Sequence, residues 1–142
     1  MGIEHRLDKI IRKLQRPLTE NEINVRLETT QMVVGQLRED PEWKNWITGA
    51  IIFGSTARHT AKTGSDVDLA IKTKQDFFFG LNFSFVTYKL RESIEKIQNE
   101  LKLNSFKINP QIIAEKWLND PKSSIYKLDV IESIKKEGIN IF

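Results

Sequence analysis

The chain has 142 residues, of which 39% are hydrophobic, enough for the core of one domain of ordinary size. A formal net charge of only +3 excludes a strongly basic protein that coats nucleic acid and a disordered polyelectrolyte. The absence of cysteine excludes disulfides, thiolate metal sites and a thiol nucleophile, so any chemistry must use oxygen or imidazole groups. The apolar runs are too short to cross a bilayer and the start shows no signal-like stretch, so a cytoplasmic protein without membrane contact is expected.

Two helices are predicted in residues 1–48. Apolar side chains recur at helical spacing over residues 3–14, and this first pattern stops before Pro17. Thr19 and Glu22 then have the spacing of a capping box, which predicts the start of a second helix. The Asp-Pro pair at residues 40–41 ends it.

The remainder of the chain alternates strands and helices. Three strands are predicted, at residues 50–53, 67–71 and 106–113. Helices are predicted over residues 83–101 and 124–137, and residues 139–142 are expected to close the sheet. Pro110 favours an edge position for the third strand, because proline donates no hydrogen bond to a neighbour. We therefore expect an α+β fold in which a small mixed sheet is flanked by helices.

The stretch between the first two strands carries the chemistry. Asp66 and Asp68 are two residues apart in an extended segment, so both carboxylates are expected on one face. Paired hard oxygens suit Mg²⁺, which usually retains water and substrate phosphates as further ligands. Gly54 lets the backbone approach an anionic group, and Ser55 is expected to cap a short helix whose amides face a phosphate. The pattern predicts a site for a metal and a triphosphate.

The order Phe53-Gly54-Ser55, ten further residues, then Asp66-Val67-Asp68-Leu69 resembles the signature of the minimal nucleotidyltransferases in the DNA polymerase β-like superfamily. This resemblance implies a nucleotidyltransferase domain over residues 49–142, with residues 1–48 as a helical extension packed on it. It also implies that Gly54 and Ser55 hold the triphosphate and that Asp66 and Asp68 are catalytic ligands of Mg²⁺, in a two-ion site if the protein is active. The reaction would move NMP, with AMP from ATP as first candidate, to a hydroxyl of a protein or small molecule. Some similar proteins act as antitoxins of a HEPN-type toxin, which would then be the protein partner.

One part of the family's pattern is missing. Active members usually carry a third carboxylate on a later strand, whereas residues 105–113 contain no acid and Asn109 stands at the possible third position. An amide can offer an oxygen to a metal but cannot accept a proton from the acceptor hydroxyl. Glu115 and Asp76 are the carboxylates considered as substitutes. A catalytically impaired module that binds nucleotide or a protein partner without transfer is therefore the alternative function.

Other residues leave further alternatives open. Arg58 can bind the triphosphate or remain a solvated loop residue, and His59 is expected at the surface. Residues 77–79, all phenylalanine, suit either the core or a partner surface. An N-terminal arm that binds DNA or RNA is a third possibility, but residues 1–48 are net neutral and do not favour it.

Overall fold

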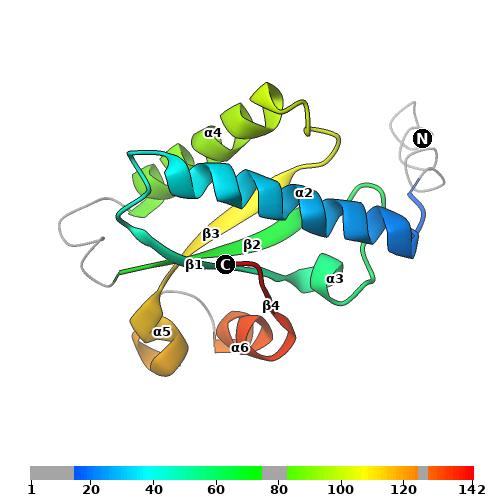
Figure 1. The fold of residues 1–142 in the computed structure, drawn as a ribbon. Helices are drawn as coiled ribbons and strands as arrows, with labels where there is room; N and C mark the ends of the chain where they lie inside the picture. Colours follow the sequence, from blue (N-terminus) through cyan, green and yellow to red (C-terminus); the bar gives the residue numbers. More distant parts are fainter. Residues whose placement is uncertain (1–14, 75–82, 125–127) are drawn as a thin grey trace, which may run out of the picture.

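The structure is a computed structural model that describes residues 15–74, 83–124 and 128–142. At its centre is a four-stranded sheet in the order β3-β2-β1-β4 (Figure 1). The strands are β1 (Ile47–Phe53), β2 (Val67–Thr73), β3 (Ile108–Ala114) and β4 (Ile139–Asn140). The pairs β1–β2 and β1–β4 are antiparallel and the pair β2–β3 is parallel, so the sheet is mixed. The predicted α+β fold class is confirmed.

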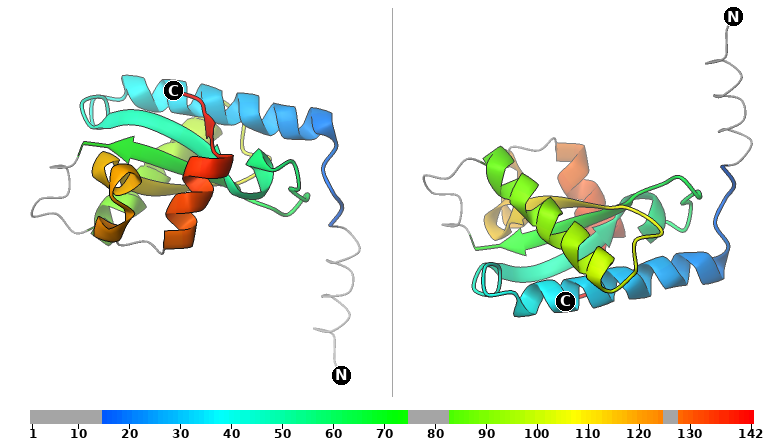
Figure 2. Two further views of the ribbon diagram at one scale, coloured as in Figure 1. Left: turned by 90° about the horizontal axis from the view of Figure 1, so that it is seen from below. Right: turned by 90° about the horizontal axis from the view of Figure 1, so that it is seen from above.

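Helices cover both faces of the sheet. On one face lie α2 (Glu20–Glu39) and α4 (Phe83–Glu100), and on the other α5 (Glu115–Asn119) and α6 (Leu128–Glu137), as the two turned views in Figure 2 show. A short helix, α3 (Gly54–Ala57), follows β1, and a 3₁₀ turn, η2 (Pro121–Ser123), follows α5. The parallel pair β2–β3 needs a crossover connection, which α4 provides. Among the described residues, no helix has the length and apolar character that a membrane crossing requires.

The capping box predicted for the second helix is confirmed at the start of α2. The Thr19 hydroxyl accepts a hydrogen bond from the Glu22 amide at 3.2 Å, and the Glu22 carboxylate accepts one from the Thr19 amide at 3.0 Å. These two bonds satisfy amides that the first turn of a helix leaves free. The first predicted helix, over residues 3–14, lies outside the described residues.

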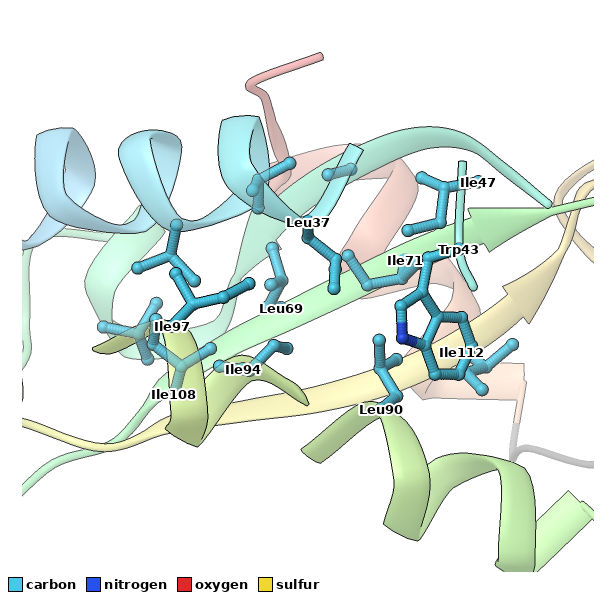
Figure 3. Packing of buried hydrophobic residues seen from close by; sticks show 14 of the residues in the cluster. Leu37, Trp43, Ile47, Leu69, Ile71, Leu90, Ile94, Ile97, Ile108 and Ile112 are labelled. Atoms are coloured by element: carbon cyan, nitrogen blue, oxygen red, sulfur yellow. The ribbon is translucent and has the colours of Figure 1, made fainter. Parts of the chain in front are cut away.

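The larger hydrophobic core lies between the sheet and the layer of α2 and α4 (Figure 3). Alternate residues of β2 face it, and Leu69 and Ile71 are fully buried against Leu37 of α2 and Leu90 of α4. Burying one such side chain stabilises the fold by about 1.5–3 kcal/mol. A smaller cluster, which includes Trp117, lies under α5 and α6. Because α2 shares the main core, it is held against the sheet, whereas the division of the chain at residue 48 stays a prediction.

The strand boundaries differ from the predicted ones for local reasons. β1 begins at Ile47, earlier than the apolar run, because Gly49 and its neighbours also pair with the end of β2. β3 begins at Ile108, two residues after Phe106, whose carbonyl accepts a hydrogen bond from the Gln98 side chain at 3.0 Å. As predicted, the strand that contains Pro110 lies at an edge of the sheet. The last helix begins at Leu128, and residues 125–127 lie outside the described ranges.

Candidate active site

The chain turns sharply where β1 ends and α3 begins. Gly54 at this turn has a φ of +73°, a backbone conformation that residues with side chains rarely adopt. Its backbone also lies against the Asp68 carboxylate, so a Cβ atom at residue 54 would overlap Oδ2 and lie 3.2 Å from Cγ. The register explains this contact, because Phe53 pairs with Asp68 across the β1–β2 ladder. Only glycine lets the chain leave β1 in this direction while the Asp68 side chain keeps its place.

The two aspartates lie at the start of β2 in different environments. Asp66 precedes the strand and is exposed, whereas Asp68 is half-buried. Burial raises the pKa of Asp68, and the negative charge of Asp66 raises it further. A hydrogen bond from Asn109 and the positive charge of Arg58 act on this pKa in the opposite direction. Because burial and a like charge both disfavour its ionised form, the Asp68 carboxylate is a group that a bound cation would stabilise.

Ser55 does not cap the short helix, contrary to expectation. It is the second residue of α3, and the N-cap position belongs to Phe53, which makes no side-chain cap hydrogen bond. The positive φ of Gly54 turns the chain directly from the strand into the helix, so no residue stands between them to act as a cap. The Ser55 carbonyl accepts a hydrogen bond from the Thr60 amide at 2.9 Å, which closes the loop after α3.

Arg58 ends α3 and forms an ion pair with α6. Its Nη1 atom lies 3.0 Å from Oε2 of Glu137, which also accepts a hydrogen bond from the Ser133 hydroxyl at 3.2 Å. The Arg58 side chain is 46% exposed, so the pair is partly screened by water. The charge of Arg58 nevertheless acts on Asp68, which places the guanidinium at the edge of the site.

β3 places an amide beside Asp68. Asn109 and Asp68 are direct partners in the parallel β2–β3 ladder, and the Asn109 side chain donates a hydrogen bond to the Asp68 carboxylate. The Asn109 carbonyl oxygen Oδ1 accepts a hydrogen bond from Nη2 of Arg91 at 3.5 Å. Arg91 belongs to α4, on the face of the sheet away from α5 and α6, and β3 is an edge strand, so the contact of Arg91 with Asn109 lies at this edge of the sheet. The amide therefore directs N–H toward the carboxylate and its oxygen toward the guanidinium.

The donor set of the site contains two acids. Within the three described ranges, no group of three or more His, Cys, Asp or Glu side chains is placed to hold a metal ion. Glu115 begins α5 and is exposed, and Asp76 lies outside the described residues. Gln111 buries its Oε1 atom, which has no hydrogen-bond partner among the residues that the structure describes. Two carboxylates at the start of a strand fit a Mg²⁺ ion whose other ligands are water and phosphate oxygens.

Arg26 of α2 is a site residue that sequence reasoning missed. Its guanidinium is buried and donates hydrogen bonds to the carbonyl oxygens of Ser65 and Thr63, the latter at 3.1 Å. It also lies over the Phe106 ring, 5.0 Å from the centroid. Burial lowers the pKa of Arg26, and the charge of Asp66 is among those that act against this shift. Arg26 thus holds the loop that leads into the two aspartates.

The sequence does contain a weak signal for Arg26. Its position falls at helical spacing among the buried residues of α2, where an unpaired charge is costly and a partner is therefore expected. The identity of the partner was not predictable, because the bonded carbonyls lie 37 and 39 residues further along the chain.

The other candidates are placed as follows. His59 is exposed, as predicted, and its Nδ1 atom lies 2.9 Å from Oε2 of Glu20. The three phenylalanines at residues 77–79 and the basic residues of the first predicted helix lie outside the described ranges.

Comparison with known proteins adds one finding. A family model described as polymerase beta, nucleotidyltransferase, matches residues 42–131. The matched range contains β1, α3, β2, α4 and β3, and with them the two aspartates, Gly54 and Asn109. No curated protein matches the chain.

Proposed function

Because the chain belongs to the polymerase beta nucleotidyltransferase family, we propose that it binds a nucleoside triphosphate with Mg²⁺ and transfers the nucleoside monophosphate to a hydroxyl group. ATP is the first candidate donor, so the transferred group is AMP. The observation that carries the proposal is the packing of Gly54 against Asp68. This packing fixes the half-buried Asp68 carboxylate close to Asp66 and next to the turn from β1 into α3.

Each residue has a role that its position supports. Asp66 and Asp68 hold Mg²⁺, which neutralises phosphate charge and orients the triphosphate when it is bound. Gly54 and Ser55 contact the terminal phosphates, and Arg58 adds a positive charge at the edge of the site. In the transfer, the acceptor hydroxyl gives its proton to solvent water, its oxygen forms a bond to the α-phosphorus, the bond from that phosphorus to the bridging oxygen breaks, and pyrophosphate leaves with the electron pair.

The acceptor is a hydroxyl of a protein or a small molecule. A HEPN-type toxin is the specific protein acceptor that we propose, on the basis of the resemblance of the Gly54-to-Asp68 pattern to the minimal nucleotidyltransferases. Incubation of the chain and such a partner with α-labelled ATP tests it: label should appear on the partner, and Asp66→Asn or Asp68→Asn should abolish the transfer.

A second function is favoured by Asn109. The acceptor hydroxyl must lose a proton during transfer, and the amide that lies beside Asp68 cannot take it. The alternative is therefore a module that binds the triphosphate, or a protein partner, without transferring the nucleotide.

Calorimetric titration of ATP, CTP, GTP and UTP in the presence of Mg²⁺ tests the binding that both functions share. At least one triphosphate should bind, and binding should disappear with EDTA and in the variant Asp66→Asn/Asp68→Asn. Asp129→Asn, an exposed aspartate on α6, is the matched control and should bind as the wild type does. If no triphosphate binds, the proposed function is wrong, and the search turns to protein partners.

A further inference from the structure

Two arginines lie near the Asp68–Asn109 pair, Arg58 and Arg91, and their charges have different partners. Arg58 forms its ion pair with Glu137 at 3.0 Å. Arg91 instead meets the neutral oxygen of Asn109, and none of the ion pairs found within residues 15–74, 83–124 and 128–142 includes it. A guanidinium held by a neutral amide keeps its full positive charge for another anionic partner.

The orientation of Asn109 removes it from the possible metal ligands. Its oxygen is directed at Arg91 and its N–H at the Asp68 carboxylate. The reversed amide would set N–H against the guanidinium and oxygen against the carboxylate, so both neighbours favour the same orientation. Position 109 therefore presents a hydrogen-bond donor to the site where a metal ligand would have to present an oxygen.

The charges of such a site can be compared with those of a two-ion site. In the charge that the protein supplies, two divalent cations held by two carboxylates leave two positive charges at close range for the triphosphate alone to neutralise. One divalent cation with two carboxylates is neutral, and the Arg91 guanidinium then adds one positive charge toward the triphosphate. The two aspartates therefore suit one divalent metal ion, and Arg91 supplies the second positive charge as a fixed guanidinium.

We propose that this site takes a single divalent cation, and that the Arg91 guanidinium, positioned by Asn109, stands in the place of a second one as a contact for the triphosphate. The inference rests on the proposed binding of a triphosphate and specifies how that binding is achieved. It assigns Asn109 the role of a positioning residue that holds Arg91 at the β3 edge of the site, and not that of a ligand.

Mn²⁺ provides a direct count of the ions. The full chain is titrated with Mn²⁺ in the presence of α,β-methylene ATP, free Mn²⁺ is followed by electron paramagnetic resonance, and affinity for the analogue is measured by calorimetry. We expect one Mn²⁺ per chain in the wild type. Arg91→Gln should keep this stoichiometry and weaken binding of the analogue by about tenfold, as expected for the loss of a charge-assisted contact.

Two further variants complete the test. Lys96→Gln removes an exposed charge from the same helix, α4, and should change the affinity for the analogue by less than Arg91→Gln does. Asn109→Asp/Arg91→Gln supplies a third carboxylate and removes the competing cation, so a second Mn²⁺ should bind and broaden the signal of the first. Thermal melting of each variant confirms that it is folded.

The outcomes separate this inference from the proposed function. Two Mn²⁺ ions in the wild type, or equal effects of Arg91→Gln and Lys96→Gln, overturn the inference while the binding of a triphosphate stands. If the wild type binds neither Mn²⁺ nor the analogue, the proposed function fails and the inference fails with it.

Discussion

Substitution of Gly54 by alanine tests the geometry on which the site depends. The new methyl group must fit at a φ of +73° and against the Asp68 carboxylate, which it would overlap. We expect Gly54→Ala to lower the free energy of unfolding and to weaken Mg²⁺-dependent binding of a triphosphate. Both changes should occur while the rest of the fold stays as it is in the wild type.

The magnitude follows from two contributions. The positive φ alone costs an alanine about 1–2 kcal/mol. The Asp68 carboxylate must also move away from Asn109, and a hydrogen bond to a charged group contributes about 1.5 kcal/mol at the lower end of its range, which suits a half-buried group. Together they predict a loss of about 3 kcal/mol in the free energy of unfolding, a large part of the stability of a small domain.

Urea denaturation followed by tryptophan fluorescence measures this loss. Gly35→Ala is the matched control: Gly35 is exposed within α2, a Cβ atom there has nothing within 4 Å, and the substitution should add about 0.5–1 kcal/mol. In an Asp68→Ala background the carboxylate is gone, so the cost of Gly54→Ala should fall by about 1 kcal/mol or more. If Gly54→Ala unfolds at the same urea concentration as the wild type, the reasoning about this turn is refuted.

Three further changes probe the surroundings of the site. Asp68→Asn should raise the melting temperature in metal-free buffer, because burial and the neighbouring aspartate disfavour the ionised form and raise its pKa; a lower melting temperature contradicts this. Arg26→Lys should lower the free energy of unfolding in urea by about 2 kcal/mol, since an ammonium group does not reproduce the planar fork that bridges two carbonyls; an unchanged midpoint argues against the bridge. Hydrogen bonds from Arg16 and Thr19 lower the pKa of Glu22 from 4.5 to about 2, so its stabilising contribution is complete above pH 4.5 and is lost as the pH falls through about 2. Glu22→Gln should therefore flatten the melting temperature across that interval, and an unaltered profile would exclude this source.

The parts of the fold that were predictable are those whose information lies close together in the sequence. The capping box needs two residues three positions apart, and the start of α2 followed from it. The turn from β1 into α3 was predictable because an apolar run ends at Gly54. Asp66 and Asp68 were predicted as a close pair of carboxylates for the same reason, because the alternation of side chains in a strand is a local rule.

The residues that set the charge around the site were not predictable in the same way. Arg26 meets a loop 37 and 39 residues away, and Arg91 meets Asn109 across 18 residues and the edge of a sheet. Both contacts depend on how α2 and α4 pack on the sheet, and no local pattern encodes that packing. The sequence shows only that Asn109 stands where an acid is expected, whereas the structure places the Arg91 guanidinium 3.5 Å from its side-chain oxygen.

The ion pair between Arg58 and Glu137 leads to a last prediction. A triphosphate that recruits Arg58 must compete with Glu137, whose carboxylate lies 3.0 Å from the guanidinium. Because the pair is partly exposed and screened by water, breaking it costs little, so Glu137→Gln should tighten binding of the triphosphate by only about two- to fivefold. Glu132→Gln, an exposed glutamate on the same helix, provides the control and should leave the affinity unchanged. Calorimetry at low and moderate salt separates the two variants, and if Glu137→Gln binds the triphosphate no better than Glu132→Gln does, Arg58 does not contact the triphosphate.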